Sequence, residues 1–120
     1  MQPEDRDAAL LWDMREAARE IVEFVHGVSY VAFAADKKLR YAVERELMIV
    51  GEAASRVSEA FRDQHPEIPW SGIIGQRNVL AHEYGEVVIT RVWRVAVERI
   101  PELLRQLEPL IPPIPEVDTP

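Results

Sequence analysis

Apolar residues recur at helical spacing through the middle of the chain, and this repeat most limits what the chain can fold into. Between Asp36 and Phe61 they follow one another in steps of four and three, at Val43, Leu47, Val50, Ala54, Val57 and Phe61. Such steps return to one face of a helix, and their sustained alternation is typical of a seam against a neighbouring helix. The repeat predicts one helix from Asp36, whose side chain can cap its start, to Phe61.

The rest of the chain shows similar spacing, and no segment alternates as a β-strand does. A first helix is expected over residues 5–25, with its apolar stripe at Leu10, Met14, Ala17, Ala18, Ile21 and Val25 and a stop at Gly27. A short third helix is expected over residues 70–83, after a break that contains two prolines. A fourth helix begins near Val87, and Pro101 is expected to kink or split it.

These elements predict an all-α fold, an antiparallel up-down bundle of four to five helices. One domain of this kind fits a chain of 120 residues. We place the bundle at residues 1–108. Residues 109–120 contain five of the nine prolines, which predicts an extended or disordered tail.

The composition argues against several classes of protein. The chain has no cysteine, which removes disulfide scaffolds, thiolate metal sites and cysteine nucleophiles. His26 and His65 have no companions at metal-ligand spacing, so we expect neither a zinc site nor another cofactor. The N-terminus is acidic where a signal peptide would be basic, and the uncharged apolar stretch at residues 24–35 is too short to cross a bilayer. We therefore expect a cytoplasmic protein with no membrane partner.

The net charge of −7 means that any nucleic-acid partner must use a local site. Residues 1–35 hold three basic and seven acidic side chains, whereas residues 77–105 hold five basic and four acidic ones. Two helices are therefore able to present an arginine-rich face, through Arg40, Arg45, Arg91 and Arg94. The alternative is that these arginines are solvated and pair with carboxylates one helical turn away.

The segment from Arg77 to Tyr84 gathers an arginine, an amide at Asn78, an imidazole at His82 and a phenol. On an ideal helix Arg77 and Tyr84 return to nearly one face, whereas Arg77 and His82 diverge by roughly 140°, which a long arginine side chain can bridge. This set of groups suits cleavage of an RNA phosphodiester. Histidine titrates near neutrality and can take a proton from the attacking 2'-hydroxyl or give one to the leaving oxygen. Arginine offers forked donors to the negative charge of the transition state, and no metal is needed.

A purely structural explanation of the same residues is also open. Polar side chains near the end of a helix commonly bond to the last carbonyl groups, and a histidine there favours the helix dipole. Arg77 is also placed to pair with Glu83 or Glu52.

The order of the chain's motifs resembles the HepT-like toxins of the HEPN superfamily. Arg77, His82 and Tyr84 match the family's Arg-x4-His-x-Tyr signature, and residues 50–53 (Val-Gly-Glu-Ala) resemble its Ile-Gly-Glu-Ala segment. Residues 65–70 resemble the family's entry to the third helix, and Trp93 and Pro101-x-Leu103 fit its last helices. The resemblance covers roughly residues 5–108.

The resemblance implies a homodimer with a shared cleft and a metal-independent endoribonuclease that acts as a toxin. Arg77 and His82 would be catalytic, and Asn78 and Glu52 would support the site. Family members of this kind are neutralised by a small MNT-type nucleotidyltransferase antitoxin, which transfers AMP to the motif tyrosine, here Tyr84. Added negative charge and bulk beside His82 would repel an RNA phosphate. Two other functions stay open: a module that binds RNA, nucleotide or partner without cleavage, and a structural helical dimer.

Overall fold

The computed structural model describes residues 5–82 and 86–113, with the side chains of residues 5–76 and 88–113. These residues form helices and no strand, so the predicted all-α class is confirmed. The elements are α1 (Asp5–Val25), α2 (Tyr30–Ala35), α3 (Lys37–Arg56), α4 (Glu59–Gln64), α5 (Trp70–His82), α6 (Glu86–Arg94), the π-helical turn η1 (Val95–Arg99), α7 (Ile100–Leu107) and the 3-10 turn η2 (Glu108–Leu110).

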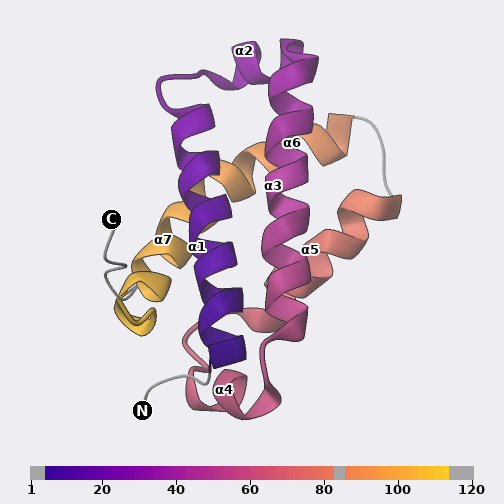
Figure 1. Ribbon diagram of the computed structural model, residues 1–120. Coiled ribbons are helices and arrows are strands. Elements are labelled where there is room, and N and C mark those ends of the chain that lie inside the picture. Colours follow the sequence, from indigo (N-terminus) through magenta and orange to yellow (C-terminus); the bar gives the residue numbers. More distant parts are fainter. Residues whose placement is uncertain (1–4, 83–85, 114–120) are drawn as a thin grey trace, which may run out of the picture.

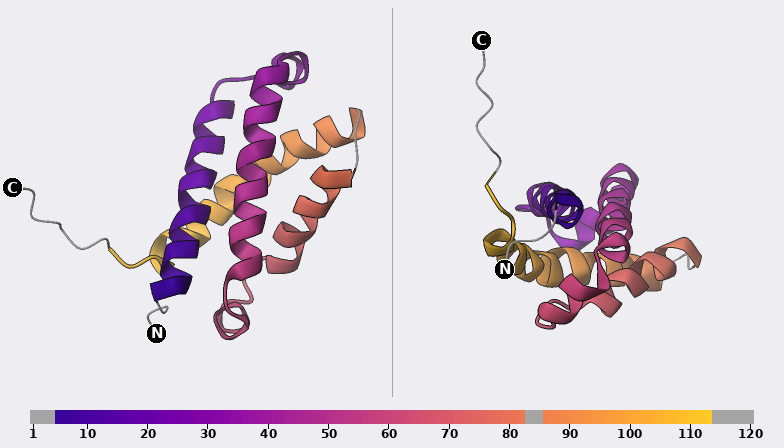
Figure 2. Two further views of the ribbon diagram at one scale, coloured as in Figure 1. Left: turned by 45° about the vertical axis from the view of Figure 1, so that its right-hand side comes forward. Right: turned by 60° about the horizontal axis from the view of Figure 1, so that its bottom comes forward.

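Two long helices, α1 and α3, lie side by side and run in opposite directions (Figure 1). The stretch from α6 through η1 to α7 crosses this pair at an angle, and α5 packs mainly against α3 (Figures 1 and 2). Across the described ranges, no helix has both the length and the apolar character of a membrane span.

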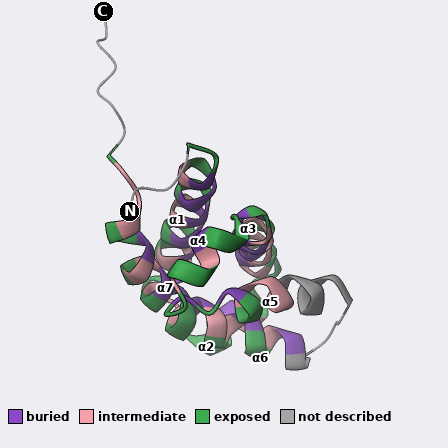
Figure 3. Cartoon of the chain, turned by 90° about the horizontal axis from the view of Figure 1, so that it is seen from below, coloured by how far each residue is buried: buried purple, intermediate pink, exposed green. Residues whose placement is uncertain are grey.

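The core contains the apolar residues that the spacing identified. All six members of the predicted α1 stripe are buried, and so are all six members of the seam from Val43 to Phe61. The crossing stretch adds Val88, Val92, Ala96, Ile100, Leu103 and Leu107. Buried residues line the sides of the helices that face one another (Figure 3). Burial of this shared apolar surface stabilises the bundle, at about 25 cal/mol for each Å² removed from water.

The prediction of one unbroken helix from Asp36 to Phe61 is wrong in its last part. Asp36 does cap α3, because its carboxylate accepts from the Leu39 amide at 3.0 Å. However, α3 ends at Arg56, and Val57 has an extended backbone with ψ 139°. Ser58 then caps a second, short helix, α4. Apolar spacing continues across the break because both helices face the same core, so periodicity alone does not reveal it.

The break after α3 is held by a buried carboxylate from the other end of the chain. Asp7 on α1 is only 5% exposed, and it is the one buried charged residue among those described. It accepts hydrogen bonds from the Ser58 amide at 2.9 Å and from the Ser58 hydroxyl at 2.6 Å. A charged acceptor with two donors offsets the cost of burying its charge. Asp7 therefore ties the start of α1 to the start of α4.

Helix α2 was not predicted, because its six residues are too few to show a helical repeat. Gly27, with φ 72°, turns the chain after α1 as expected. Ser29 then caps α2 by accepting from the Ala32 amide at 3.1 Å. The Tyr30 hydroxyl lies 3.0 Å from the Thr90 hydroxyl, which connects α2 to α6.

The fourth predicted helix is interrupted before Pro101, as expected: α6 ends at Arg94 and a further helix, α7, begins at Ile100. A π-helical turn at residues 95–99 precedes the proline, with the Ile100 amide donating to the Val95 carbonyl five residues back. Proline has no N–H, and its ring crowds the carbonyl four residues earlier. A wider turn around that carbonyl accommodates the ring, so α6, η1 and α7 continue as one crossing stretch.

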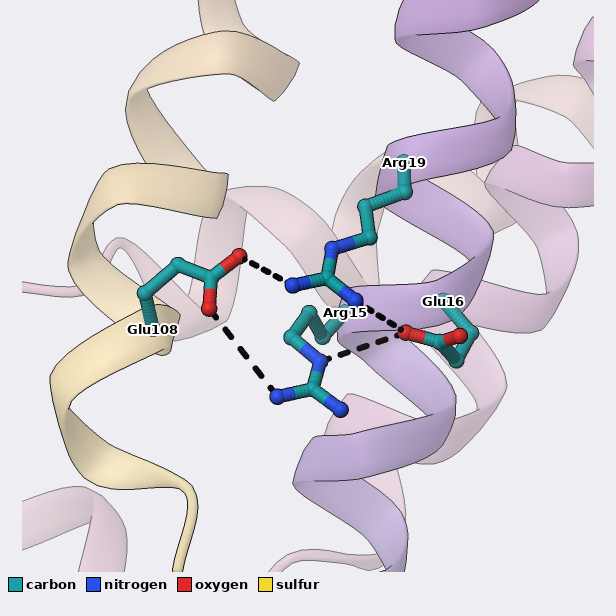
Figure 4. Close-up of polar contacts among 4 residues, drawn as sticks. All are labelled: Arg15, Glu16, Arg19 and Glu108. Atoms are coloured by element: carbon teal, nitrogen blue, oxygen red, sulfur yellow. Dashed lines mark hydrogen bonds and ion pairs between the residues drawn. The ribbon is translucent and has the colours of Figure 1, made fainter. Parts of the chain in front are cut away.

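The described residues beyond α7 still contact the bundle. Leu110 and Ile111 pack against the core. Glu108 pairs with Arg19 at 2.9 Å and with Arg15 at 3.9 Å, and both arginines also contact Glu16 (Figure 4). Arg19, Glu16 and Glu108 are partly exposed and only Arg15 is largely covered, so each of the exposed pairs contributes no more than about 1 kcal/mol. The boundary between bundle and tail at residue 108 stays a prediction.

Two like charges meet between α1 and α3. Partial burial and a hydrogen bond to the Glu20 side chain raise the pKa of Glu46 to about 7, and the Glu20 charge adds to this rise. The neighbouring Arg45 acts in the opposite direction. Near neutral pH, a large share of Glu46 therefore keeps a proton that this residue would lose in the unfolded chain.

Replacing Asp7 with alanine should destabilise the fold by about 2 kcal/mol, because the Ser58 amide and hydroxyl lose the buried acceptor that ties α1 to the start of α4. Urea unfolding followed by circular dichroism measures this loss. Asp5→Ala, in the same first turn but exposed, is the matched control and should change stability little. Equal effects of the two variants would contradict the role given to Asp7.

Replacing Glu46 with glutamine should raise the melting temperature at pH 8 and have a smaller effect at pH 5. The folded-state pKa is about 7 and lies above the ordinary value of 4.5. The proton on Glu46 therefore favours the folded state, and this contribution is lost as pH rises through about 7. Glutamine mimics the protonated acid at every pH. A lower melting temperature of Glu46→Gln at pH 8 would contradict this explanation.

Candidate functional site

The start of α5 is fixed by an aromatic cluster, formed by Phe61, His65 and Trp70. Trp70 is buried, and its indole N–H donates to the His65 carbonyl at 2.9 Å. The Phe61 ring lies 4.4 Å from the His65 ring and 6.3 Å from the Trp70 ring, measured between centroids. Ile68, between the two prolines, is 1% exposed. This packing holds the first turn of a helix whose glycines give it little intrinsic stability.

The motif identified in the sequence lies on the second half of α5 and just beyond it. Arg77, Asn78 and His82 belong to this helix, which ends at His82. Their side chains and the whole of Tyr84 lie outside the described residues. The roles of all four residues therefore stay predictions. What the structure does describe is the surface that leads up to them.

A groove lies between the first half of α5 and the crossing stretch, with α3 as its floor. Its volume is about 590 Å³. Helix α3 contributes Leu47 and Val50. The other lining residues are Glu67, Pro69, Gly72, Ile73, Gln76, Arg91, Arg94, Val95, Arg99, Ile100, Glu102, Leu103 and Gln106.

Arg91, Arg94 and Arg99 line this groove, and the π-helical turn η1 brings Arg99 to the same side of the helix as the other two. Arg91 and Arg94 are three residues apart on α6, so they lie about 60° apart around its axis. In an unbroken α-helix, Arg99 would lie about 140° from Arg94. The extra residue absorbed by η1 reduces this separation to about 40°, the value of an ordinary four-residue step. All three arginines therefore line one groove.

The groove is basic at one end and mixed at the other. Gln106 donates to the Glu67 carbonyl at 2.9 Å, which joins α7 to the segment before α5. Glu67 and Glu102 belong to that end. At the opposite end the chain passes from α5 to α6, so Gln76 and Arg91 mark the end that leads to residues 77–82.

Gln76 adds a buried donor to the basic end. Its amide nitrogen finds no hydrogen-bond partner within the described part of the chain. A buried donor in this condition is uncommon in folded proteins and needs an explanation. A ligand acceptor in the groove would satisfy it.

Other sequence-predicted residues lie elsewhere. Glu52 is exposed on α3, and its backbone carbonyl accepts from the Ser55 hydroxyl at 2.7 Å. It is not part of the groove lining. Nor are Arg40 and Arg45, so the face of four arginines stays a prediction. Arg91 and Arg94 do share a surface, but their third member is Arg99.

A second, smaller hollow adjoins the groove and shares Arg94 with it. Its volume is about 290 Å³, and its lining is Tyr30, Thr90, Trp93, Arg94, Val97 and Glu98. The Trp93 ring packs on Phe33 at 5.0 Å and meets Tyr30 edge-on at 6.1 Å, so its position is fixed by the core. The hollow therefore presents an aromatic wall directly beside an arginine.

Sequence reasoning missed two parts of this surface. Arg99 escaped because the helical spacing assumed an α-helix through residues 95–99. Tyr30 escaped because it belongs to the unpredicted helix α2. The sequence signal for Arg99 was Pro101. A proline disturbs the helical turn that precedes it, and this changes how the residues of that turn and those that follow are rotated around the helix axis.

Comparison with known proteins gives a consistent family. A family model described as "Ribonuclease HepT-like" matches residues 14–110. A Methanocaldococcus jannaschii protein named "Putative RNase MJ1380" is 35% identical over 100 residues, which cover 83% of this chain and 92% of the relative. A Thermococcus cleftensis protein named "Probable ribonuclease HepT" is 38% identical over 100 residues, covering 83% of this chain and 91% of the relative. No solved structure matches the chain.

Proposed function

Because this chain belongs to the HepT-like ribonuclease family, we propose that it is an endoribonuclease that cuts RNA without a metal ion. The observation that supports this most strongly is the family match across almost the whole bundle, which includes the helix that carries Arg77 and His82. The basic groove beside that helix gives an acidic protein a local surface for a polyanion.

The overall acidity of the chain does not oppose such a surface. More than half of the net charge of −7 comes from residues 1–35, whereas residues 77–105 hold one more basic than acidic side chain, and dissolved salt screens exposed charges beyond about 8–10 Å. A phosphate in the groove would be influenced mostly by the side chains that line it. The local arrangement of charge therefore matters more for binding than the total.

In the proposed reaction, the ribose 2'-hydroxyl attacks the adjacent phosphorus and the bond to the 5'-oxygen breaks. His82 moves the proton, taking it from the 2'-hydroxyl or giving it to the leaving oxygen. Arg77 stabilises the charge that accumulates on the non-bridging oxygens. Asn78 and Glu52 support the site. The products are a 2',3'-cyclic phosphate and a free 5'-hydroxyl.

We further propose that the active form is a homodimer. The Arg77 and His82 side chains of two subunits would then share one cleft, which doubles the positive charge available to a phosphate. Pairing of two such sites also separates the roles of proton acceptor and proton donor between two histidines.

His82→Ala should lower the rate of RNA cleavage by about 10²- to 10⁴-fold, the usual contribution of general acid–base catalysis. Arg77→Ala should lower it comparably. Cleavage of a labelled single-stranded RNA in EDTA, with analysis of the product ends, measures the rate, the absence of a metal requirement and the cyclic phosphate together.

Arg56→Ala, an exposed arginine at the end of α3, is the control and should cleave at the wild-type rate. Unchanged cleavage by the Arg77 and His82 variants would overturn the assignment. Binding of RNA without any turnover by the wild-type protein would favour a non-catalytic module instead.

We also propose that the chain is a toxin whose antitoxin is an MNT-type nucleotidyltransferase. This partner would transfer AMP to the Tyr84 hydroxyl, with release of pyrophosphate from ATP. Tyr84 is two residues from His82 in the sequence. An added phosphate and nucleoside there would repel RNA by charge and block it by bulk.

Coexpression with such a nucleotidyltransferase should increase the intact mass of the protein by one or more AMP groups. Peptide mapping should place the first group on Tyr84, and the modified protein should not cleave RNA. Tyr84→Phe should gain no mass at this position and should remain active in the presence of the partner. Full inhibition of the unmodified Tyr84→Phe variant would show that neutralisation does not depend on this modification.

A further inference from the structure

We propose that the arginine groove and the adjoining aromatic hollow form one binding track for single-stranded RNA, which leads the strand to the motif on α5. Phosphates would bind Arg91, Arg94 and Arg99, and one base would stack in the hollow. This inference rests on the proposed ribonuclease function and adds how the substrate is held and why it must be single-stranded.

The charge of the groove favours a phosphate backbone as its ligand. Three arginines line a space of about 590 Å³, against two carboxylates at its far end. Among the described residues, neither Arg94 nor Arg99 forms an ion pair. Arginine binds phosphate oxygens through two parallel donors, so a row of arginines suits a phosphate backbone better than a single small anion.

The neighbouring aromatic wall offers a place for a base. Arg94 lines both spaces, so a phosphate held there would place its nucleotide at the edge of the hollow. Trp93 and Tyr30 supply ring surface, and Thr90 and Glu98 supply polar atoms at the rim. Base stacking on aromatic side chains beside a basic groove is the usual physical basis of single-strand binding.

The groove runs toward the motif. Its basic end lies where Gln76 directly precedes the part of α5 at residues 77–82. The buried Gln76 amide, which has no partner among the described residues, provides a further donor to the strand. A duplex could not place a base in the hollow without unpairing, so the track selects RNA with unpaired bases.

Binding of a labelled single-stranded RNA 12-mer by fluorescence anisotropy tests this track. The full chain carrying His82→Ala is used so that the RNA stays intact. Adding Arg94→Gln and Arg99→Gln should weaken binding roughly tenfold. It should also reduce the slope of log affinity against log salt by about 1.4, since each phosphate neutralised on a single strand contributes about 0.7 to that slope.

A matched pair of charge removals serves as the control for the groove. Arg6→Gln and Arg56→Gln remove the same charge from exposed positions outside the groove. They should leave both the affinity and the salt slope nearly unchanged. An equal reduction of the slope by the control pair and the groove pair would show that only total charge matters, and the track would be wrong.

The hollow is tested separately at Tyr30. Tyr30→Ala should weaken RNA binding about fivefold or more, because one stacking surface is lost. Tyr30→Phe keeps the ring and loses only the hydroxyl that meets Thr90, so it should bind like the parent. Melting temperatures of both variants establish that they are folded. Equal weakening by alanine and phenylalanine would show that the hydroxyl matters and would overturn the stacking role.

Failure of the track is distinguishable from failure of the proposed function. The same groove variants with His82 intact should cleave RNA with a raised KM and a kcat near that of the wild type. If the wild type cleaves RNA and the groove variants bind and cleave as it does, the ribonuclease assignment stands and the track is wrong. The groove would then serve a protein partner, and the same variants should lose binding to the nucleotidyltransferase.

Discussion

Packing of α1 against α3 determines where every other helix can lie. The two helices meet along their length mainly through apolar side chains, and this is the most extensive contact between any two described elements. The crossing stretch covers one side of the pair, and α5 can then pack only against the remaining face of α3 (Figure 2). The apolar α3 residues Leu47 and Val50 consequently serve both as core and as the floor of the groove.

One end of the groove is held by a hydrogen bond between α7 and the segment before α5. Gln106 donates to the Glu67 carbonyl there, and the aromatic cluster of Phe61, His65 and Trp70 fixes the start of α5. The π-helical turn then rotates Arg99 into line with Arg94. The same five residues of η1 therefore do two things: they accommodate Pro101 within the helix, and they align the arginines.

The sequence by itself determined the helical class, the faces that form the core and the family. Leucine, valine and alanine at steps of three and four suffice for the first two, because a helix has a fixed rotation per residue and apolar surface must leave water. The order of motifs sufficed for the third. The same reasoning placed Arg77 and His82 on one short helix, as the structure does for their backbone.

Only the tertiary structure decided the break at Val57, the helix at Tyr30 and which arginines lie beside Arg94. The break at Val57 depends on the contact of Ser58 with Asp7, and the helix at Tyr30 on the contact of Tyr30 with Thr90; both partners are far away in sequence. The position of Arg99 beside Arg94 depends on the widened turn before Pro101, which departs from α-helical rotation. A periodic pattern carries no information about such contacts. It reports which face of a helix avoids water, whereas a binding surface depends on how separate helices are rotated and placed relative to one another.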